Sequence, residues 1–377
     1  MAICSKSNGR RRWSPDAAMA TDYDLAIVGA GPAGSVLALL AARQGMRVLL
    51  AERSRFDRRT IGETVPPEIK PLLGKLGLAH VLEGTHREAS AVMSVWGTSE
   101  PAERSHISSP YGSALHLDRR AFDAALTHAA QAAGADLRLA TSVRLEPRPR
   151  GGFDVITSAG EGATTALAAL AGGRSARGGG LPYIRSYLDD HAAVAGWLEA
   201  SGERHEHRTL VEAVPGGWFY LAQLPDGHIA VVLVTRATSI PAGKAERQQW
   251  WLALLARTTI VRSALLGCRI PSALSVCDAR ASFAPIPAGE NWFAIGDARL
   301  ARDPLSGCGI VWAIEDAIFA AEAVAGRGGG YLAAAMMERT RGDVADYLAG
   351  RARVYAEERR FPDDPYWKSR AVNAASY

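Results

Sequence analysis

A glycine-rich turn near the N-terminus is the feature that most constrains the fold of this 377-residue chain. Residues 24–53 read DLAIVGAGPAGSVLALLAARQGMRVLLAER. The pattern predicts a buried strand from Leu25 to Val28, a tight turn, an Ala/Leu-rich helix that ends near Gly45, and a second buried strand that stops at Glu52. A strand–turn–helix–strand unit of this kind predicts a Rossmann-like α/β domain with a parallel sheet.

Each residue type in this turn has a physical role in binding a dinucleotide. Gly29 permits the tight turn, Gly31 lets the backbone approach a pyrophosphate, and Gly34 lets the helix pack closely on the strand. The helix N-terminus presents free N–H groups to phosphate. The Glu52 carboxylate can accept from both ribose hydroxyls, which disfavours NADP. A purely structural turn would explain the glycines but not Glu52, and the motif alone does not separate NAD from FAD. We assign to the cofactor site Gly29, Gly31, Pro32, Ala33, Gly34, Glu52 and Arg53.

A second glycine-containing turn stands near the opposite end of the chain. Residues 292–298 read WFAIGDA, which predicts an apolar strand that stops at Gly296 and Asp297. Residues 303–310, DPLSGCGI, then lead into an apolar, helix-like stretch. We interpret the two distant turns as holding opposite ends of one cofactor.

Four segments together resemble the FAD-dependent monooxygenases of the para-hydroxybenzoate hydroxylase type. Residues 292–298 resemble the family's strand-plus-Gly-Asp signature, and residues 117–123, LDRRAFD, resemble its arginine three residues before Phe-Asp. Residues 62–67, GETVPP, and 303–310 look like the Gly-Glu segment and the flavin-facing loop of the tryptophan-halogenase branch. Within that branch, the chain is most similar to flavoproteins that accompany quinone-cofactor amine dehydrogenases and oxidases.

This resemblance implies the fold, the cofactor and the roles of the matching residues. The expected fold is a Rossmann-like FAD-binding domain with an inserted β-sheet substrate domain and C-terminal helices. Backbone amides at Gly307 and Gly309, with the positive end of the following helix, would stabilise negative charge on reduced flavin. The resemblance adds to the cofactor site Glu63, Thr64, Arg119 (with Arg120 as an alternate), Gly296, Asp297, Pro304, Gly307, Gly309 and Ile310, and it makes Glu63, Ser306 and Gly307 the candidate catalytic residues.

The activity implied by the resemblance is hydroxylation of an aromatic substrate by an FAD-dependent monooxygenase. Dioxygen and reduced FAD would form a flavin C4a-hydroperoxide, which transfers one oxygen atom. The substrate would be indole-like or tryptophan-like, either as a small molecule or as a residue of a partner peptide. Glu63 is the candidate proton donor beside the flavin, and its alternative role is that of a structural loop carboxylate.

Two departures from the family pattern bear on this reaction. The family usually carries an aspartate in mid-chain, whereas residues 170–175 read LAGGRS, with Leu170 in its place. This casts doubt on an NAD(P)H contact there, so a separate flavin reductase could supply the electrons. Tryptophan halogenases also have a WxWxIP motif, which is absent, and an active-site lysine, which residues 88–96 lack.

Three alternatives stay open. A flavin-dependent halogenase predicts a strict requirement for halide. A flavin reductase or dehydrogenase of the geranylgeranyl-reductase type predicts turnover without oxygen. An assembly or binding protein predicts a colourless protein that takes up no FAD.

Aromatic residues offer a candidate substrate pocket. Trp218 and Tyr220 lie two residues apart on one predicted strand, so they share a face, and Trp96 stands in a second apolar run. These side chains could line an aromatic pocket over the flavin, or they could form the core of a sheet.

The periodicity divides the chain into two lobes and two terminal regions. We expect a disordered tail over 1–21, a discontinuous FAD-binding domain, a substrate domain, and helices followed by an irregular basic-aromatic tail from Phe361 to Trp367. The FAD-binding domain is assigned to 22–90, 113–192 and 277–330, the substrate domain to 91–112 and 193–276, and the C-terminal region to 331–377.

Composition excludes several other classes of protein. The net charge of +4 does not argue for a nucleic-acid partner. The four cysteines have no CxxC spacing, so we expect no metal site, and so few in a long chain fit a reducing cytoplasm. No apolar run approaches the length of a membrane span.

Overall fold

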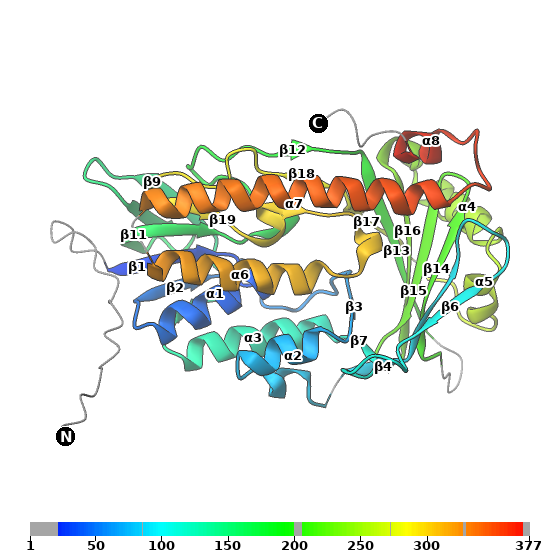
Figure 1. The fold of residues 1–377 in the computed structure, drawn as a ribbon, viewed down its shortest axis with the longest axis horizontal. Helices are drawn as coiled ribbons and strands as arrows, with labels where there is room; N and C mark the ends of the chain where they lie inside the picture. The colour runs from blue at the N-terminus through cyan, green and yellow to red at the C-terminus, as the bar shows by residue number, and fades with distance from the viewer. Residues whose placement is uncertain (1–21, 85, 200–205, 272, 327–328, 372–377) are drawn as a thin grey trace, which may run out of the picture.

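The computed structural model describes residues 22–84, 86–199, 206–271, 273–326 and 329–371. Two lobes lie side by side, each built on a seven-stranded sheet, and one long helix runs along both of them (Figure 1). The mixed α/β fold class predicted from the sequence is confirmed. The predicted disordered tail over 1–21 lies outside the described residues.

The first lobe holds the Rossmann-like unit. Its strand order is β8-β2-β1-β11-β10-β9, with β19 pairing on β11. Strands β1, β2, β8, β11 and β19 are parallel, whereas β9 and β10 are antiparallel additions. The strands are β1 (Tyr23–Val28), β2 (Val48–Ala51), β8 (Asp136–Arg138), β9 (Val143–Pro147), β10 (Phe153–Thr157), β11 (Gly162–Leu170) and β19 (Trp292–Ala294).

Both faces of this sheet are buried, which explains why its strands read as continuous apolar runs. Leu25 and Ile27 on β1 face a core shared with several helices, and Ala26 between them faces a second core with Trp292 and Leu145. The helices of the first core include α1 (Pro32–Arg43), α3 (Arg119–Ala132) and α6 (Gly309–Gly326), which lie next to one another in Figure 1.

The second lobe is a sheet with the order β17-β13-β16-β15-β14-β5-β6, antiparallel except between β14 and β5. Helices α4 and α5 cover one face through Trp251 and Val261, which pack with Phe219. The other face carries Trp218 and meets the C-terminal helices. The elements are β5 (Ala91–Val95), β6 (Ala102–Ser105), β13 (His191–Glu199), β14 (Arg208–Val214), β15 (Gly217–Gln223), β16 (His228–Arg236), β17 (Ser275–Asp278), α4 (Lys244–Leu255) and α5 (Ile260–Ala264).

Two small sheets join the lobes, in the orders β3-β7-β4 and β12-β18-β20. Helix α2 follows β3 in the chain. The bounds are β3 (Thr64–Val65), α2 (Ile69–Lys75), β4 (Arg87–Ala89), β7 (Ala114–His116), β12 (Ser186–Tyr187), β18 (Ser282–Phe283) and β20 (Leu300–Ala301).

The C-terminal region corrects one prediction. Helix α7 (Gly329–Glu357) extends from the first lobe to the second (Figure 1), and α8 (Pro365–Ala371) replaces the irregular tail expected up to Trp367. Asp364 caps α8 by accepting from the backbone N–H groups of Tyr366 and Trp367, and proline suits the first helical position. Both aromatic side chains are buried, so this segment belongs to the core. Within the described ranges, no helix is long and apolar enough to cross a membrane.

Candidate active site

Four strand ends meet at one edge of the first sheet. Val28 pairs in register with Ala51 and with Leu170, and Leu170 pairs with Ala294. Because these parallel strands end together, the segments that follow them emerge side by side, although they are far apart in the sequence. Ligands of open α/β sheets bind at this edge.

The turn after β1 has glycines of two kinds. A Cβ on Gly34 would lie 1.9 Å from the carbonyl oxygen of Gly29, and a Cβ on Gly29, whose φ is +109°, would lie 2.5 Å from the carbonyl oxygen of Ala171. These two glycines are therefore required by backbone packing. Gly31 differs, because a Cβ there would meet nothing within 4 Å. It caps α1, so the open space beside it is where a phosphate would approach the helix N-terminus.

Glu52 follows β2 and is fixed beside this turn. Its Oε2 accepts from the backbone N–H of Ala30 at 2.9 Å, and its Oε1 accepts from that of Ser54 at 2.9 Å. Each carboxylate oxygen has a further lone pair for a ribose hydroxyl. Arg53 points elsewhere, since its Nη2 donates to Ser175 Oγ at 2.8 Å.

The turn after β19 lies against the same helix N-terminus. A Cβ on Gly296, whose φ is +57°, would lie 2.9 Å from the Cβ of Ala33. Asp297 is next in the chain, and its Oδ2 lies 3.3 Å from Nε of Arg174. The structure thus brings Glu52 and Asp297 to one edge.

Arg119 at the start of α3 links this turn to the Gly-Glu segment. Its Nη1 donates to the carbonyl oxygens of Ile61 at 3.3 Å and Gly62 at 3.1 Å, and its Nη2 pairs with Asp123 at 2.9 Å. Burial lowers the pKa of the guanidinium, but the carboxylates of Asp123, Glu63 and Asp297 raise it above its ordinary value. Arg119 is therefore surrounded by acceptors rather than directed into solvent.

Glu63 is a buried carboxylate with one free oxygen. The residue is 2% exposed, its Oε2 accepts from the backbone N–H of Gly62 at 3.0 Å, and its Oε1 has no hydrogen-bond partner. Burial raises the pKa of Glu63, against the opposing effects of backbone N–H groups, Arg119 and Trp197. An unsatisfied buried carboxylate oxygen is costly, which is typical of a functional site.

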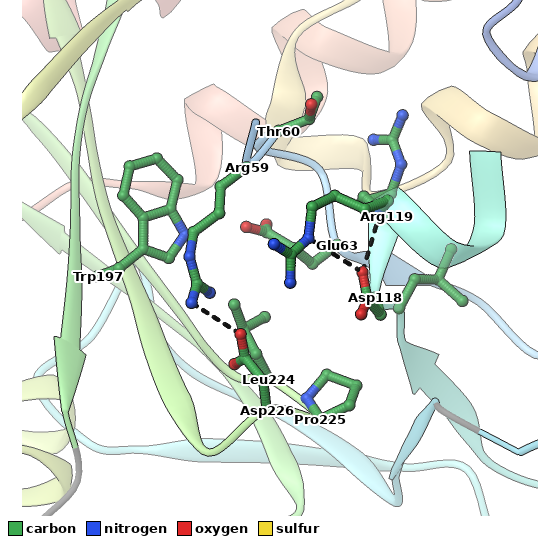
Figure 2. Close-up of a pocket in the computed structure, with 11 residues that line it drawn as sticks. Arg59, Thr60, Glu63, Asp118, Arg119, Trp197, Leu224, Pro225 and Asp226 are labelled. Carbon is green, nitrogen blue, oxygen red and sulfur yellow. Dashed lines mark hydrogen bonds and ion pairs between the residues drawn. The ribbon is translucent and has the colours of Figure 1, made fainter. Parts of the chain in front are cut away.

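A small, partly open pocket lies over Glu63 between the two lobes. Figure 2 shows the Glu63 side chain between Trp197, on β13, and Arg119. The indole Nε1 of Trp197 is buried and makes no hydrogen bond of full geometry, but it lies close enough to the Glu63 carboxyl to lower its pKa. At the rim, Arg59 pairs with Asp226 at 2.7 Å. Sequence reasoning missed Trp197, Arg59 and Asp226, because no local motif marks them.

The side chain of Asp303 caps the short helical turn in the loop before α6. Asp303 is 4% exposed, and its Oδ1 accepts from the backbone N–H of Leu305 at 2.9 Å. Ser306 donates to the carbonyl oxygen of Asp303 at 3.1 Å. Gly307 has a φ of +63°, and a Cβ on Gly307 or Gly309 would meet nothing within 4 Å. Two glycines in open space at a helix start suit a ligand that approaches the backbone, as the sequence predicts.

A family model described as FAD binding domain matches residues 22–331. The chain belongs to this family. LodB of Marinomonas mediterranea, named as an FAD-dependent oxidoreductase, is 25% identical over 94% of this chain and 98% of its own length. The tryptophan 2-halogenase of Chondromyces crocatus is 28% identical over 79% of this chain and 60% of its own length.

Two solved structures share the fold. The chondrochloren halogenase CndH superposes with a TM-score of 0.83 and 22% identity over 94% of this chain and 87% of that one. QhpG, a peptidyl tryptophan dihydroxylase essential for tryptophylquinone cofactor biogenesis, has a TM-score of 0.76 and 23% identity over 93% of this chain and 79% of that one.

The protein is therefore an FAD-dependent oxidoreductase, and the site fits FAD. The open space at Gly31 and the fixed carboxylate of Glu52 suit the ADP half. Asp297 lies along the same edge, and the glycines before α6 suit the flavin. Leu170, which replaces the family's aspartate, is buried in β11 between its strand neighbours, so that position takes part in the sheet core.

The three aromatic pocket candidates pack in one cluster but make different polar contacts. Trp218 is 2% exposed and donates from Nε1 to Tyr355 Oη at 3.0 Å, and Trp96 donates to the carbonyl oxygen of Val354 at 2.9 Å. Both pack against α7 and α8, so the core alternative describes them. Tyr220 differs, since its hydroxyl lies 2.6 Å from Thr64 Oγ1. Burial and the nearby Glu63 carboxylate raise the pKa of Tyr220 well above its ordinary value.

Proposed function

We propose that the protein is an FAD-dependent monooxygenase that hydroxylates an indole-like aromatic ring, carried by a small molecule or by a partner peptide. The observation that carries the proposal is the pocket over Glu63, where a carboxylate oxygen and an indole N–H are both buried and make no hydrogen bond of full geometry. The pocket lies between a cofactor lobe and a sheet, a position where small-molecule sites are common.

The reaction replaces a C–H bond of the ring with C–OH. One atom of dioxygen enters the substrate and the other leaves as water, with two electrons from a reduced nicotinamide or a separate flavin reductase and two protons from solvent. FAD, held by Gly31, Glu52 and Asp297, would supply the redox chemistry that carries these electrons to dioxygen. The chain's own residues position the ring and move the proton that the substituted carbon loses.

Glu63 suits that proton transfer. Its Oε2 accepts from the Gly62 N–H, and Oε1 is buried beside the pocket without a hydrogen-bond partner. In the ionised form, Oε1 can take up the proton that the substituted ring carbon loses. Because burial raises its pKa, Glu63 is a stronger base than an exposed glutamate. Trp197 Nε1 can donate to a carbonyl or hydroxyl of the same substrate.

A halogenase is the second candidate, and the fold of CndH favours it. The lining of the pocket argues against it, because its described residues include arginine but no lysine, and the family's halogenation route uses a lysine. QhpG shares the fold to a similar extent and acts on a tryptophan in a peptide, which supports the hydroxylase.

The test is product analysis with FAD, a reductant and air. Indole, tryptophanamide and tryptophan-containing peptides are supplied, with and without chloride or bromide. We expect incorporation of isotope-labelled oxygen from dioxygen in the absence of halide. Halogenated product that requires halide would establish the second candidate, and oxygen-independent reduction of a quinone or isoprenoid would establish a reductase. Failure to bind FAD would refute all three.

A further inference from the structure

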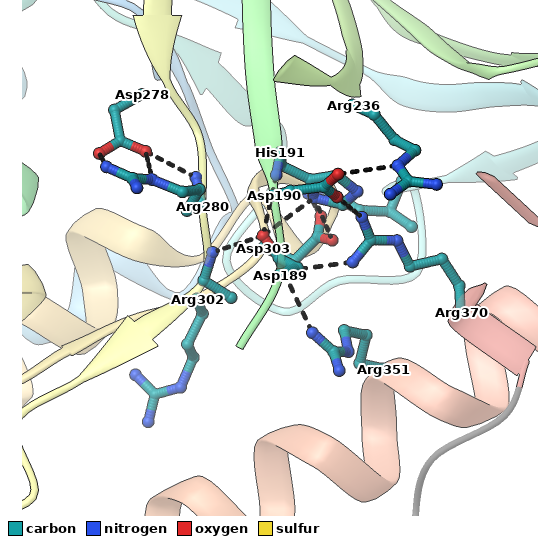
Figure 3. A network of polar contacts seen from close by, with 12 residues as sticks. Asp189, Asp190, His191, Arg236, Asp278, Arg280, Arg302, Asp303, Arg351 and Arg370 are labelled. Carbon is teal, nitrogen blue, oxygen red and sulfur yellow. Dashed lines mark hydrogen bonds and ion pairs between the residues drawn. The ribbon is translucent and has the colours of Figure 1, made fainter. Parts of the chain in front are cut away.

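A cluster of buried polar side chains forms at the start of the loop that precedes α6. Asp189, His191 and Asp303 have ligand atoms within 4.8 Å of one another. Figure 3 shows Arg351, from α7, and Arg370, from α8, reaching the same cluster. Since Asp303 begins the loop with the two open glycines, whatever fixes Asp303 also fixes that loop.

Helix α7 holds Asp303 at two atoms. Tyr355 Oη donates to Asp303 Oδ2 at 2.8 Å, and the backbone N–H of Asp303 donates to Tyr347 Oη at 3.2 Å. Asp303 Oδ1 caps the loop through Leu305. Tyr355 is 1% exposed and Asp303 is 4% exposed, so water cannot readily replace these hydrogen bonds.

The Tyr355 hydroxyl is itself positioned by the second lobe. It accepts from Trp218 Nε1, on β15, at 3.0 Å. The Tyr355 ring also contacts Trp96 at 5.7 Å and Trp367 at 5.8 Å between ring centroids. A continuous path therefore leads from the substrate sheet through Tyr355 to the loop.

A bound cation is the other reading of the cluster, and the charges disfavour it. Asp189 Oδ2 already pairs with Arg351 at 3.1 Å and with Arg370 at 3.5 Å, and both oxygens of Asp303 accept hydrogen bonds. Two arginines thus neutralise Asp189, and Asp303 Oδ2 lies 3.4 Å from Nδ1 of His191. His191 has no hydrogen bond at either ring nitrogen, but its ring stacks on Tyr366 at 5.3 Å.

We propose that Tyr355 is a positioning residue for FAD, which holds the 303–309 loop in the conformation that contacts the isoalloxazine. The proposal rests on the proposed role of this loop as the flavin-facing one. It predicts that the two halves of the cofactor respond differently. The ADP half binds at Gly31 and Glu52, which have no contact with Tyr355, whereas the flavin half depends on the loop.

The test compares Tyr355→Phe with Tyr366→Phe. Both tyrosines are 1% exposed in one aromatic cluster, but the Tyr366 hydroxyl approaches Tyr355 Oη at 3.4 Å and does not reach Asp303. Affinities for FAD and ADP are measured by titration, together with the absorbance spectrum of bound flavin and the melting temperature of the FAD-free protein. For Tyr355→Phe we expect FAD to bind about tenfold more weakly with an altered spectrum, and ADP to bind as in the wild type. Tyr366→Phe should leave all of these unchanged.

Equal weakening of FAD and ADP would overturn the proposal, since it would report general loss of the fold. Unchanged FAD affinity and spectrum in Tyr355→Phe would overturn it as well. If that variant does not fold, Tyr347→Phe replaces it, because it removes the other α7 hydroxyl on Asp303 and should weaken FAD selectively. These binding measurements do not depend on which reaction the enzyme performs. A failure of the proposal for Tyr355 can therefore be told apart from a failure of the proposed hydroxylation.

Discussion

The two ends of the cofactor site are built in different ways. At the ADP end, a single turn provides nearly everything, through backbone atoms and the glycines that permit their close approach. At the flavin end, side chains from the Gly-Glu segment, α3, β13, β15 and the 303–309 loop converge from distant parts of the chain. The first end depends on local geometry and the second on tertiary packing, so they should differ in how substitutions affect them.

The largest effect is expected from Gly34→Ala. The added Cβ would lie 1.9 Å from the Gly29 carbonyl oxygen, and the turn must open to accommodate it. Overpacking against backbone should cost about 3 kcal/mol of unfolding free energy, measured by denaturant titration, and abolish FAD binding.

Gly31→Ala is the matched control for that substitution. Its Cβ meets open space, so the FAD-free protein should lose less than about 1 kcal/mol, while FAD binding still fails because the methyl group occupies the phosphate approach. If the two variants were equally stable, the conclusion that backbone packing requires a glycine at position 34 but not at position 31 would be wrong.

The sequence predicted the strand, turn and helix of the expected ADP end because that information is local. The strand, the three glycines and Glu52 lie within 30 residues, and each constraint involves near neighbours. The positions of Trp197 and Tyr355 could not be predicted in this way. Trp197 meets Glu63, and Tyr355 meets Asp303, only after distant segments pack. The helix at Pro365 was missed because a short amphipathic segment has little periodicity, although its Asp-Pro start could have indicated a cap.

The next largest effect concerns the flavin end. Glu63→Gln removes the base, so the hydroxylation rate should fall about 100-fold, whereas FAD affinity should change little. Glu68→Gln, at an exposed glutamate five residues away, should have no effect. Wild-type activity should rise with pH through the raised pKa of Glu63, and Glu63→Gln should lose this dependence.

The same substitution has a stability counterpart. The folded-state pKa of Glu63 is raised above its unfolded value, so the free energy of unfolding should fall as pH increases between those two values. Glu63→Gln should abolish this decline in the FAD-free protein, measured by thermal unfolding across pH. A wild-type stability that increases over that interval would contradict the assignment of Oε1 as buried and unpartnered.

Asp297→Ala tests the middle of the site with a smaller effect. Loss of a charged hydrogen-bonding group should weaken FAD binding about tenfold while leaving ADP affinity unchanged. Asp154→Ala is the control, since Asp154 forms a partly exposed pair with Arg148 on the same sheet. Weaker ADP binding in Asp297→Ala would instead place Asp297 at the ADP end.

The smallest expected effect separates substrate binding from chemistry. Trp197→Phe keeps an aromatic but smaller side chain and removes the indole N–H, so KM should rise about fivefold, as expected for one neutral hydrogen bond, with kcat unchanged. Trp250→Phe, on the covered face of the same lobe, is the control and should alter neither constant. A lower kcat at constant KM would show instead that this N–H acts on the reacting atoms, and the flavin end would then contain two groups for the chemistry and none dedicated to holding the substrate.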